Sequence, residues 1–137
     1  MARHWVKSTV RITSAAAIAE EITAALGVQP TQTHERGALM SPRNPKSRRF
    51  DRHVWLLDSD VPEEASLTDH LRWAVGVGEH VGARASALPE DWSGGIVIGW
   101  TPEESQEGVY LDRDLLARLG SISFDVALTT YEIGDAE

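Results

Sequence analysis

The stretch that decides the fold runs from Val6 to Gly27 and reads VKSTVRITSAAAIAEEITAALG. Its first part alternates apolar and polar residues, which is the period of a strand with one buried and one solvated face. Its second part spaces Ile18, Ile22 and Leu26 for one side of a helix, and Gly27 follows as a residue suited to end that helix. The stretch therefore predicts a strand that leads into a short amphipathic helix.

A second copy of this pattern lies near the end of the chain, with the helix first. Residues 111–131 read LDRDLLARLGSISFDVALTTY. Three leucines form the helix face and Gly120 ends the helix. In the strand that follows, the residues expected to share the buried face are Ile122, Phe124, Val126, Leu128 and Thr130.

Two further strands and a helical insert are expected between the copies. Apolar runs at 53–58 and 96–100 predict the strands, and the first of them is placed centrally because both of its faces are apolar. Residues 66–75 predict a helix that ends or kinks at Gly76 and Gly78, and 81–88 predict a second short helical segment.

This order of elements predicts an α+β fold, a two-layer sandwich. We expect a ferredoxin-like four-stranded sheet with helices on one face, right-handed crossovers in each half, and the extra helical insert between the two halves. The other face of the sheet would then be open. One domain is expected over residues 1–137, with a long basic loop at 31–52 and a frayed acidic tail at 134–137.

Composition narrows the class of protein. The chain has 137 residues and no cysteine, which excludes disulfides, thiolate metal sites and cysteine nucleophiles. Its start has no signal-peptide pattern, and its longest apolar runs are too short to cross a bilayer, so we expect a cytoplasmic protein without membrane contact.

The net charge of −8 is distributed unevenly along the chain. Residues 1–57 hold nine of the 13 Lys and Arg and four of the 21 Asp and Glu, a balance of +5, and the remainder carries −13. Such an acidic total repels nucleic acid and favours encounter with a basic partner.

Several short motifs together resemble a known family. They are the helix ending in Leu26-Gly27 before Pro30, Gly37 with the basic loop, Trp55 to Ser59, and Leu119-Gly120 before the last strand. On these residues the chain resembles the bacterial domain of unknown function family 4279 over nearly its whole length. The resemblance implies a small standalone domain and carries over no catalytic residue.

The basic loop is the first candidate binding site. Its cations attract phosphate, carboxylate or an acidic surface, and the alternative interpretation is a solvated loop that offsets acidity elsewhere. The residues expected to bind an anion or a partner are Arg36, Arg43, Lys46, Arg48, Arg49, Arg52 and His53.

Three aromatic residues form the second candidate site. Trp5 and Tyr131 lie on the polar-facing sides of the first and last strands, and with Trp100 they would form an apolar patch on the open face. The alternative is that these rings pack beneath the long loop.

No catalytic, metal or cofactor motif is recognised. The histidines lack the spacing that places two ligands on one helix face, and neither a nucleophile elbow nor a phosphate loop occurs. We therefore expect no metal, no cofactor, and no nucleic-acid partner.

These observations favour a non-enzymatic module that binds another protein, either as an inhibitor or immunity-type protein or as a homodimer. The alternative is a small-ligand binder or enzyme in which the basic loop holds an anionic substrate, with His34 and His53 beside its arginines.

Overall fold

Strand β1 (Trp5–Ser14) is the middle strand of a five-stranded sheet with the order β2-β3-β1-β4-β5. The computed structural model describes residues 5–101 and 109–131. On its two sides β1 pairs antiparallel with β3 (His53–Asp58) and β4 (Ser93–Thr101). The edge strands are β2 (Gln32–His34), antiparallel to β3, and β5 (Phe124–Thr130), parallel to β4.

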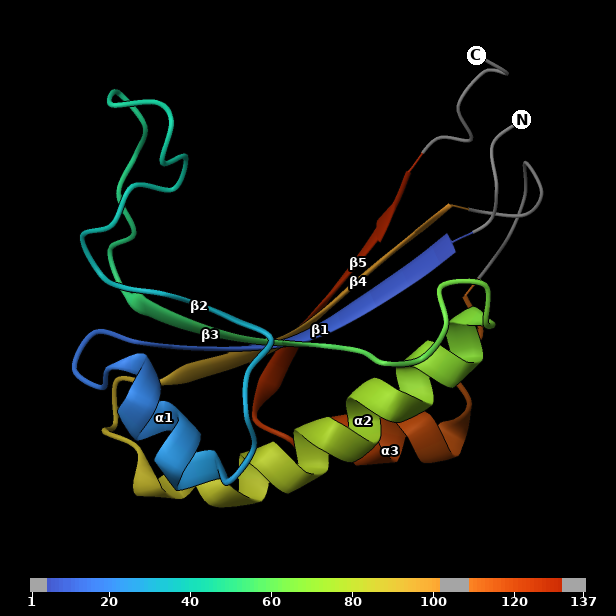
Figure 1. Ribbon diagram of the computed structural model, residues 1–137. Coiled ribbons are helices and arrows are strands. Elements are labelled where there is room, and N and C mark those ends of the chain that lie inside the picture. The colour runs from blue at the N-terminus through green and yellow to red at the C-terminus, as the bar shows by residue number, and fades with distance from the viewer. Residues whose placement is uncertain (1–4, 102–108, 132–137) are drawn as a thin grey trace, which may run out of the picture.

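Three helices form the second layer. They are α1 (Ala19–Leu26), α2 (Leu67–Arg84), which continues into a 3₁₀ turn at Ala85–Ala87, and α3 (Arg113–Gly120). Figure 1 shows all three on the same side of the sheet. The α+β class and the placement of the helices on one face are therefore confirmed, and the opposite face carries no helix in the described ranges.

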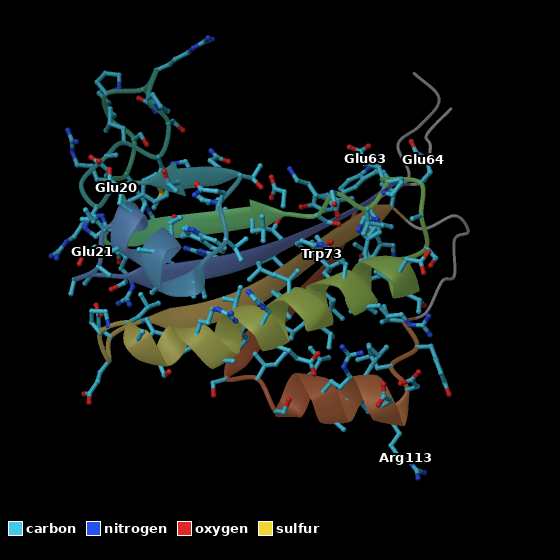
Figure 2. The ribbon with its side chains drawn as sticks, turned by 60° about the horizontal axis from the view of Figure 1, so that its bottom comes forward. Glu20, Glu21, Glu63, Glu64, Trp73 and Arg113 are labelled. Carbon is cyan, nitrogen blue, oxygen red and sulfur yellow. The ribbon has the colours of Figure 1, made fainter. Side chains whose placement is uncertain are left out.

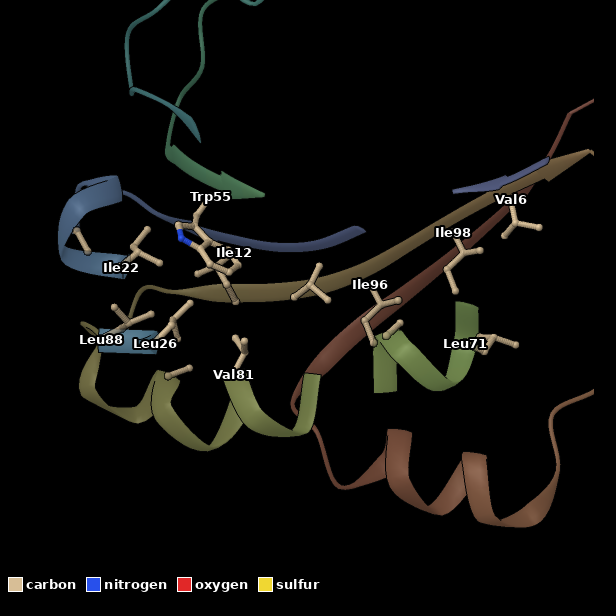
Figure 3. Close-up of a cluster of buried hydrophobic side chains, with 14 of the residues drawn as sticks. Val6, Ile12, Ile22, Leu26, Trp55, Leu71, Val81, Leu88, Ile96 and Ile98 are labelled. Atoms are coloured by element: carbon tan, nitrogen blue, oxygen red, sulfur yellow. The ribbon is translucent and has the colours of Figure 1, made fainter. Parts of the chain in front are cut away.

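The core fills the space between these layers. Val6, Val10 and Ile12 alternate along β1 and are completely buried. They belong to one cluster with side chains from α1, α2, β3 and β4 (Figure 3), including Ile22, Leu26, Leu71, Val81, Ile96 and Ile98. Trp55 of β3 is also completely buried, and its indole Nε1 donates to Thr23 Oγ1 of α1 at 3.1 Å. This bond satisfies the one polar atom that burial of the tryptophan would otherwise leave unpaired.

Of the predicted helix ends, the one at Gly27 is confirmed and the one at Gly76 and Gly78 is wrong. Gly27 closes α1 with φ of +72°, as predicted. The predicted break at Gly76 and Gly78 is wrong, because α2 runs without interruption, and the predicted separate segment at 81–88 is its last turn plus the 3₁₀ turn. A Cβ on Gly78 would lie 3.1 Å from the Ile122 side chain. This glycine therefore allows close packing inside the helix instead of ending it.

The predicted count of four strands is also wrong. The additional strand is β2, which lies inside the segment 31–52 that the sequence predicts as loop. The connection from β1 through α1 leads to β2, and β2 is parallel to β1 with β3 between them. The strand at 53–58 is thus an antiparallel neighbour of β1, interior to the sheet but not at its centre.

The last strand has the predicted alternation but not the predicted burial. Ile96 pairs with Val126 and Ile98 with Leu128, so the even-numbered side chains of β5 face the helix layer. Because β5 is an edge strand, Val126 and Leu128 remain 39% and 38% exposed. The tail predicted at 134–137 lies outside the described residues.

Two glycine substitutions test this packing. A Cβ on Gly94 would lie 2.3 Å from the Phe124 ring, so we expect Gly94→Ala to lower the free energy of unfolding by about 1 to 3 kcal/mol. Gly76 has open space around it in the middle of α2, so Gly76→Ala should raise stability by about 0.5 to 1 kcal/mol. Urea denaturation of both variants measures the difference. If Gly94→Ala left the free energy of unfolding unchanged, the packing of the Phe124 ring on Gly94 of β4 would be contradicted.

Candidate functional site

The face of the sheet opposite the helices, called here the open face, is set by the pairing of β1. Lys7, Thr9 and Arg11 alternate with the core residues of β1 and therefore point away from the helices. Across from Lys7 and Arg11, β4 supplies Gly99 and Gly95. Because glycine has no side chain, the sheet backbone is uncovered beside Arg11 at Gly95, whereas an aromatic ring, Tyr131, fills the space at Gly99 beside Lys7.

A shallow groove of about 300 Å³ lies on the open face over β1, β4 and β5. Arg11 and Thr13 line it from β1, and Ser93, Gly95 and Val97 line it from β4. Asp125 and Ala127 of β5 form its other side. The Arg11 and Asp125 side chains are exposed and make no hydrogen bond or ion pair with any described residue, so both charges are available to a ligand.

One end of the open face carries an aromatic pair. The rings of Trp5 and Tyr131 have centroids 5.2 Å apart and tilt by 39°. A Cβ on Gly99 would lie 2.8 Å from the Tyr131 ring, so the ring occupies the space that this glycine leaves. The structure thus brings together two of the three aromatic residues that the sequence predicts for this face.

Trp100 is the exception, and its predicted place on the open face is wrong. It pairs with Val6 in β1, so its side chain shares the helix-facing side with Ile96 and Ile98, and it is 3% exposed. Its indole Nε1 has no hydrogen-bond partner in the described part of the chain. Its even number along β4 was the signal that should have placed it in the core.

At the other end of the open face stands an ordered hairpin at residues 35–52, called here the basic arm. Its two sides are joined by backbone hydrogen bonds, from Gly37 to Phe50 at 2.7 Å, from Phe50 to Ala38 at 2.9 Å and from Met40 to Arg48 at 2.9 Å. Figure 1 shows it rising away from the helix layer. The segment expected to be an irregular loop is therefore a projecting element with its own hydrogen bonds.

The arm is fixed at its base by two histidines. The His34 ring stacks on Phe50 with centroids 4.4 Å apart, and His53 Nδ1 accepts the Arg36 backbone N–H at 3.1 Å. Nδ1 of His53 is therefore unprotonated in this contact. The structure gives both rings a role in holding the arm.

The cations of the arm divide into two groups. Arg49 Nη1 donates to the Gly37 carbonyl at 2.7 Å, and Arg52 Nε donates to Thr13 Oγ1 at 3.2 Å. These two guanidinium groups hold the arm to itself and to β1. The other group has side chains with no hydrogen bond or ion pair to a described residue, and it consists of Arg36, Arg43, Lys46 and Arg48.

Asp91 is the anchor that joins the arm to the ends of β1 and β4. Its carboxylate accepts from Ser14 Oγ at 2.9 Å and from the Ala15 and Ala16 backbone N–H groups at 2.6 and 3.2 Å. The Arg52 guanidinium lies 3.8 Å from it and also donates to the Asp91 carbonyl. The Ser14 hydroxyl, the two backbone donors and Arg52 hold the pKa of this carboxyl below its usual value, although partial desolvation opposes them.

The helix layer carries much of the negative charge. Figure 2 shows Glu20 and Glu21 on α1, and Glu63 and Glu64 ahead of α2 near the opposite end of the molecule. Between α2 and α3, Arg118 makes a two-point contact with Glu79, at 2.6 and 3.2 Å, and this contact lowers the pKa of the Glu79 carboxyl. Glu20 lines one hollow with Glu35 at the base of the arm, whereas Glu79 lies between α2 and α3 in the helix layer.

One serine–histidine contact has the form of a catalytic pair but is buried. Ser8 Oγ lies 3.1 Å from His70 Nδ1, and His70 Nε2 lies 2.9 Å from the Pro62 carbonyl. Because that carbonyl only accepts, Nε2 carries the proton and Nδ1 accepts from the serine. Both side chains are almost completely buried, so the contact holds α2 against β1 and offers no nucleophile to solvent.

The described ranges contain no group of three or more His, Asp or Glu side chains placed to hold a metal ion. None of the helices in these ranges is long and apolar enough to cross a membrane.

Together the fold and its surface define a small two-layer α+β domain with an open sheet face and a basic hairpin arm. The chain belongs to the family described as Domain of unknown function (DUF4279), whose model matches residues 4–132. The match spans nearly the whole chain and confirms the resemblance seen in the sequence. No curated protein and no solved structure matches the chain.

The Asp91 anchor gives a prediction about acid stability. A carboxyl whose pKa is lowered by folding stabilises the protein at neutral pH, and this contribution disappears as the pH falls through the folded-state pKa. We expect Asp91→Asn to lower the melting temperature at neutral pH, and the gap from the wild type to narrow as the pH is lowered below 3.8. Glu90→Gln is the control, because Glu90 is exposed and contacts no described polar group. Equal losses for both variants would show that Asp91 does not anchor the arm.

Proposed function

We propose that this domain is a non-enzymatic module that binds an acidic surface of another protein with its basic arm and open face. The observation that carries the proposal is that four cations with no hydrogen bond or ion pair to a described residue stand on an ordered hairpin beside the open face. The partner expected from the sequence was basic, because the total charge is negative. The position of the free cations favours an acidic partner for this particular surface.

Because its backbone is held by hydrogen bonds, the arm is better suited to binding than a flexible loop would be. Its backbone hydrogen bonds and the Arg49 contact hold the hairpin before any partner arrives. Less conformational entropy is then lost on binding, and more of the electrostatic attraction appears as affinity. Met40, on the arm, is 48% exposed and adds an apolar contact next to the free charges.

The open face extends this surface toward the aromatic pair. Lys7 and Arg11 of β1 continue the positive charge, and Trp5 with Tyr131 supplies rings of the kind enriched at the centres of protein interfaces. Asp58 reduces the charge only locally, since it lies 4.0 Å from Lys7 at the surface.

A second candidate function is supported by the groove alone. Arg11 next to the bare backbone of Gly95, with Thr13 and Ser93 hydroxyls nearby, is a combination that can receive a small carboxylate or phosphate. A thermal-shift screen of such anions on wild type and Arg11→Ala tests this candidate, because only binding in the groove gives a shift that the variant loses.

We also propose that the sheet is a ferredoxin-like arrangement with one added unit. The support is connectivity: β1 and β2 are parallel with β3 between them, and β3 and β4 are parallel with β1 between them. In this interpretation β2, β3, β1 and β4 form the ferredoxin-like set of four strands, and α3 with β5 is joined to that set at its β4 edge.

Charge reversal on the arm tests the protein-binding proposal. Poly-glutamate serves as the acidic polypeptide probe, and fluorescence anisotropy measures its affinity. We expect Arg43→Glu with Lys46→Glu to weaken binding by about tenfold or more, since two attractive contacts become repulsive. The matched control is Arg72→Glu with Arg113→Glu, the same change of charge at exposed cations of the helix layer.

The control variant shows whether poly-glutamate binds at the arm or is attracted only by the overall charge of the protein. Equal weakening by the two double variants, or no binding of the probe by the wild type, would contradict the proposal. Tighter binding of single-stranded RNA than of poly-glutamate at physiological salt would favour a nucleic-acid partner instead.

A further inference from the structure

The two edges of the sheet differ in how they are protected. Natural sheets protect their edges with short strands, prolines, lysines or bulges, because an open edge pairs readily with another strand. The β2 edge has only three residues and is followed by the arm. The β5 edge has seven residues, FDVALTT, with no proline, glycine or lysine and one charged side chain, Asp125. Apart from Asp125, this edge has none of the usual protection.

The backbone of β5 shows which of its N–H and C=O groups are not used in pairing with β4. Tyr131 N–H donates to the Trp100 carbonyl of β4 at 2.9 Å. The N–H and C=O of one strand residue point to the same side and alternate along the strand. Odd-numbered residues therefore bond to β4, and the groups of Phe124, Val126, Leu128 and Thr130 point outward. In the described ranges β4 is the only strand that β5 pairs with.

Apolar side chains surround this free edge. Val126 and Leu128 are each more than a third exposed, and Leu116 of α3, the helix that leads into β5, is 53% exposed. Other large apolar side chains that are exposed in the described residues belong to β4 or directly follow β5, namely Val97 and Tyr131. Such concentration marks an interaction surface.

We propose that β5 pairs antiparallel with β5 of a second copy of this chain, about a two-fold axis at Ala127, so that the two sheets become one. This surface is separate from the arm, so the inference goes beyond the proposed function and does not depend on it.

The register follows from the free backbone groups. The residues whose backbone groups point outward must lie opposite one another, so even-numbered residues pair only with even-numbered residues of the second copy. A two-fold axis at Ala127 satisfies this condition and pairs all seven residues of β5. Val126 then lies opposite Leu128 of the second copy, and both are apolar. Asp125 lies opposite Thr129, so no like charges meet across the pair. A strand that is complementary to itself in this way fits a second copy in particular.

Salt separates this association from the proposed binding of an acidic partner. Each chain carries −8, so two copies repel each other, and screening weakens that repulsion. We expect the dimer to strengthen when NaCl is raised from about 0.05 M to about 0.5 M. Binding through the arm should weaken over the same range.

Sedimentation velocity on the full chain is the test. At tens to hundreds of micromolar protein, we expect a species with twice the chain mass of 15.0 kDa. A monomer at every salt concentration would overturn the proposal and leave the arm hypothesis untouched.

Two lysine substitutions test the register. Ala127→Lys places two lysines opposite each other at the axis, and we expect the dimer to weaken about tenfold or more. Thr129→Lys makes the same change of charge two residues away, but opposite Asp125 of the second copy, and we expect about fivefold tighter dimerisation from the two symmetric ion pairs. Both positions are exposed, and thermal melts verify that each variant is folded. A dimer that both substitutions weaken equally, or that neither affects, would show that the interface lies elsewhere.

Discussion

The alternation of side chains along β1 is the constraint on which the rest of the molecule depends. β1 is paired on both sides, so each of its residues is committed either to the helix layer or to the open face. Val6, Val10 and Ile12 take the first direction and form the centre of the core. Lys7, Thr9 and Arg11 take the second direction, and because their side chains are polar this face of the sheet can remain in contact with solvent. A shift of one residue in the β1 register would exchange the two sets and destroy both surfaces at once.

Elements with a strong period could be predicted from the sequence, and the weakly patterned ones could not. The β1–α1 stretch buries one regular face, and the α3–β5 stretch has an equally regular alternation although β5 stays largely exposed at the sheet edge, so both patterns were clear. β2 has three residues, of which two are exposed, and its pairing to β3 is made by backbone groups that leave no trace in the side-chain pattern. The arm is held in the same way. Its prolines and charges concealed a hairpin whose hydrogen bonds are independent of hydrophobicity.

In the candidate site, too, local features could be predicted from the sequence and features that depend on tertiary contacts could not. Trp5 and Tyr131 were predicted for the open face, because strand parity is a local property. The division of the arm's cations into bonded and free groups depends on contacts with Gly37, Thr13 and Asp91, and the last two are distant in sequence. Likewise, the glycines under Phe124 and Tyr131 gain their meaning only when β4 and β5 are side by side. Composition identified the charged segment, and tertiary structure determined which charges are available.

The central position of β1 also affects how the protein acquires its structure. Trp5 pairs with Thr101, so the first strand to be synthesised must wait for a partner almost a hundred positions later in the chain. During translation β3 can pair with β1 earlier, but the hydrophobic side of β1 is not fully enclosed until α2 and β4 have left the ribosome. Contacts between such distant positions slow folding, because a long loop must close before they contribute. The nascent chain therefore exposes the apolar side of β1 until α2 and β4 have been made, and a chaperone that recognises emerging apolar side chains would have access to Val6, Val10 and Ile12 during that interval.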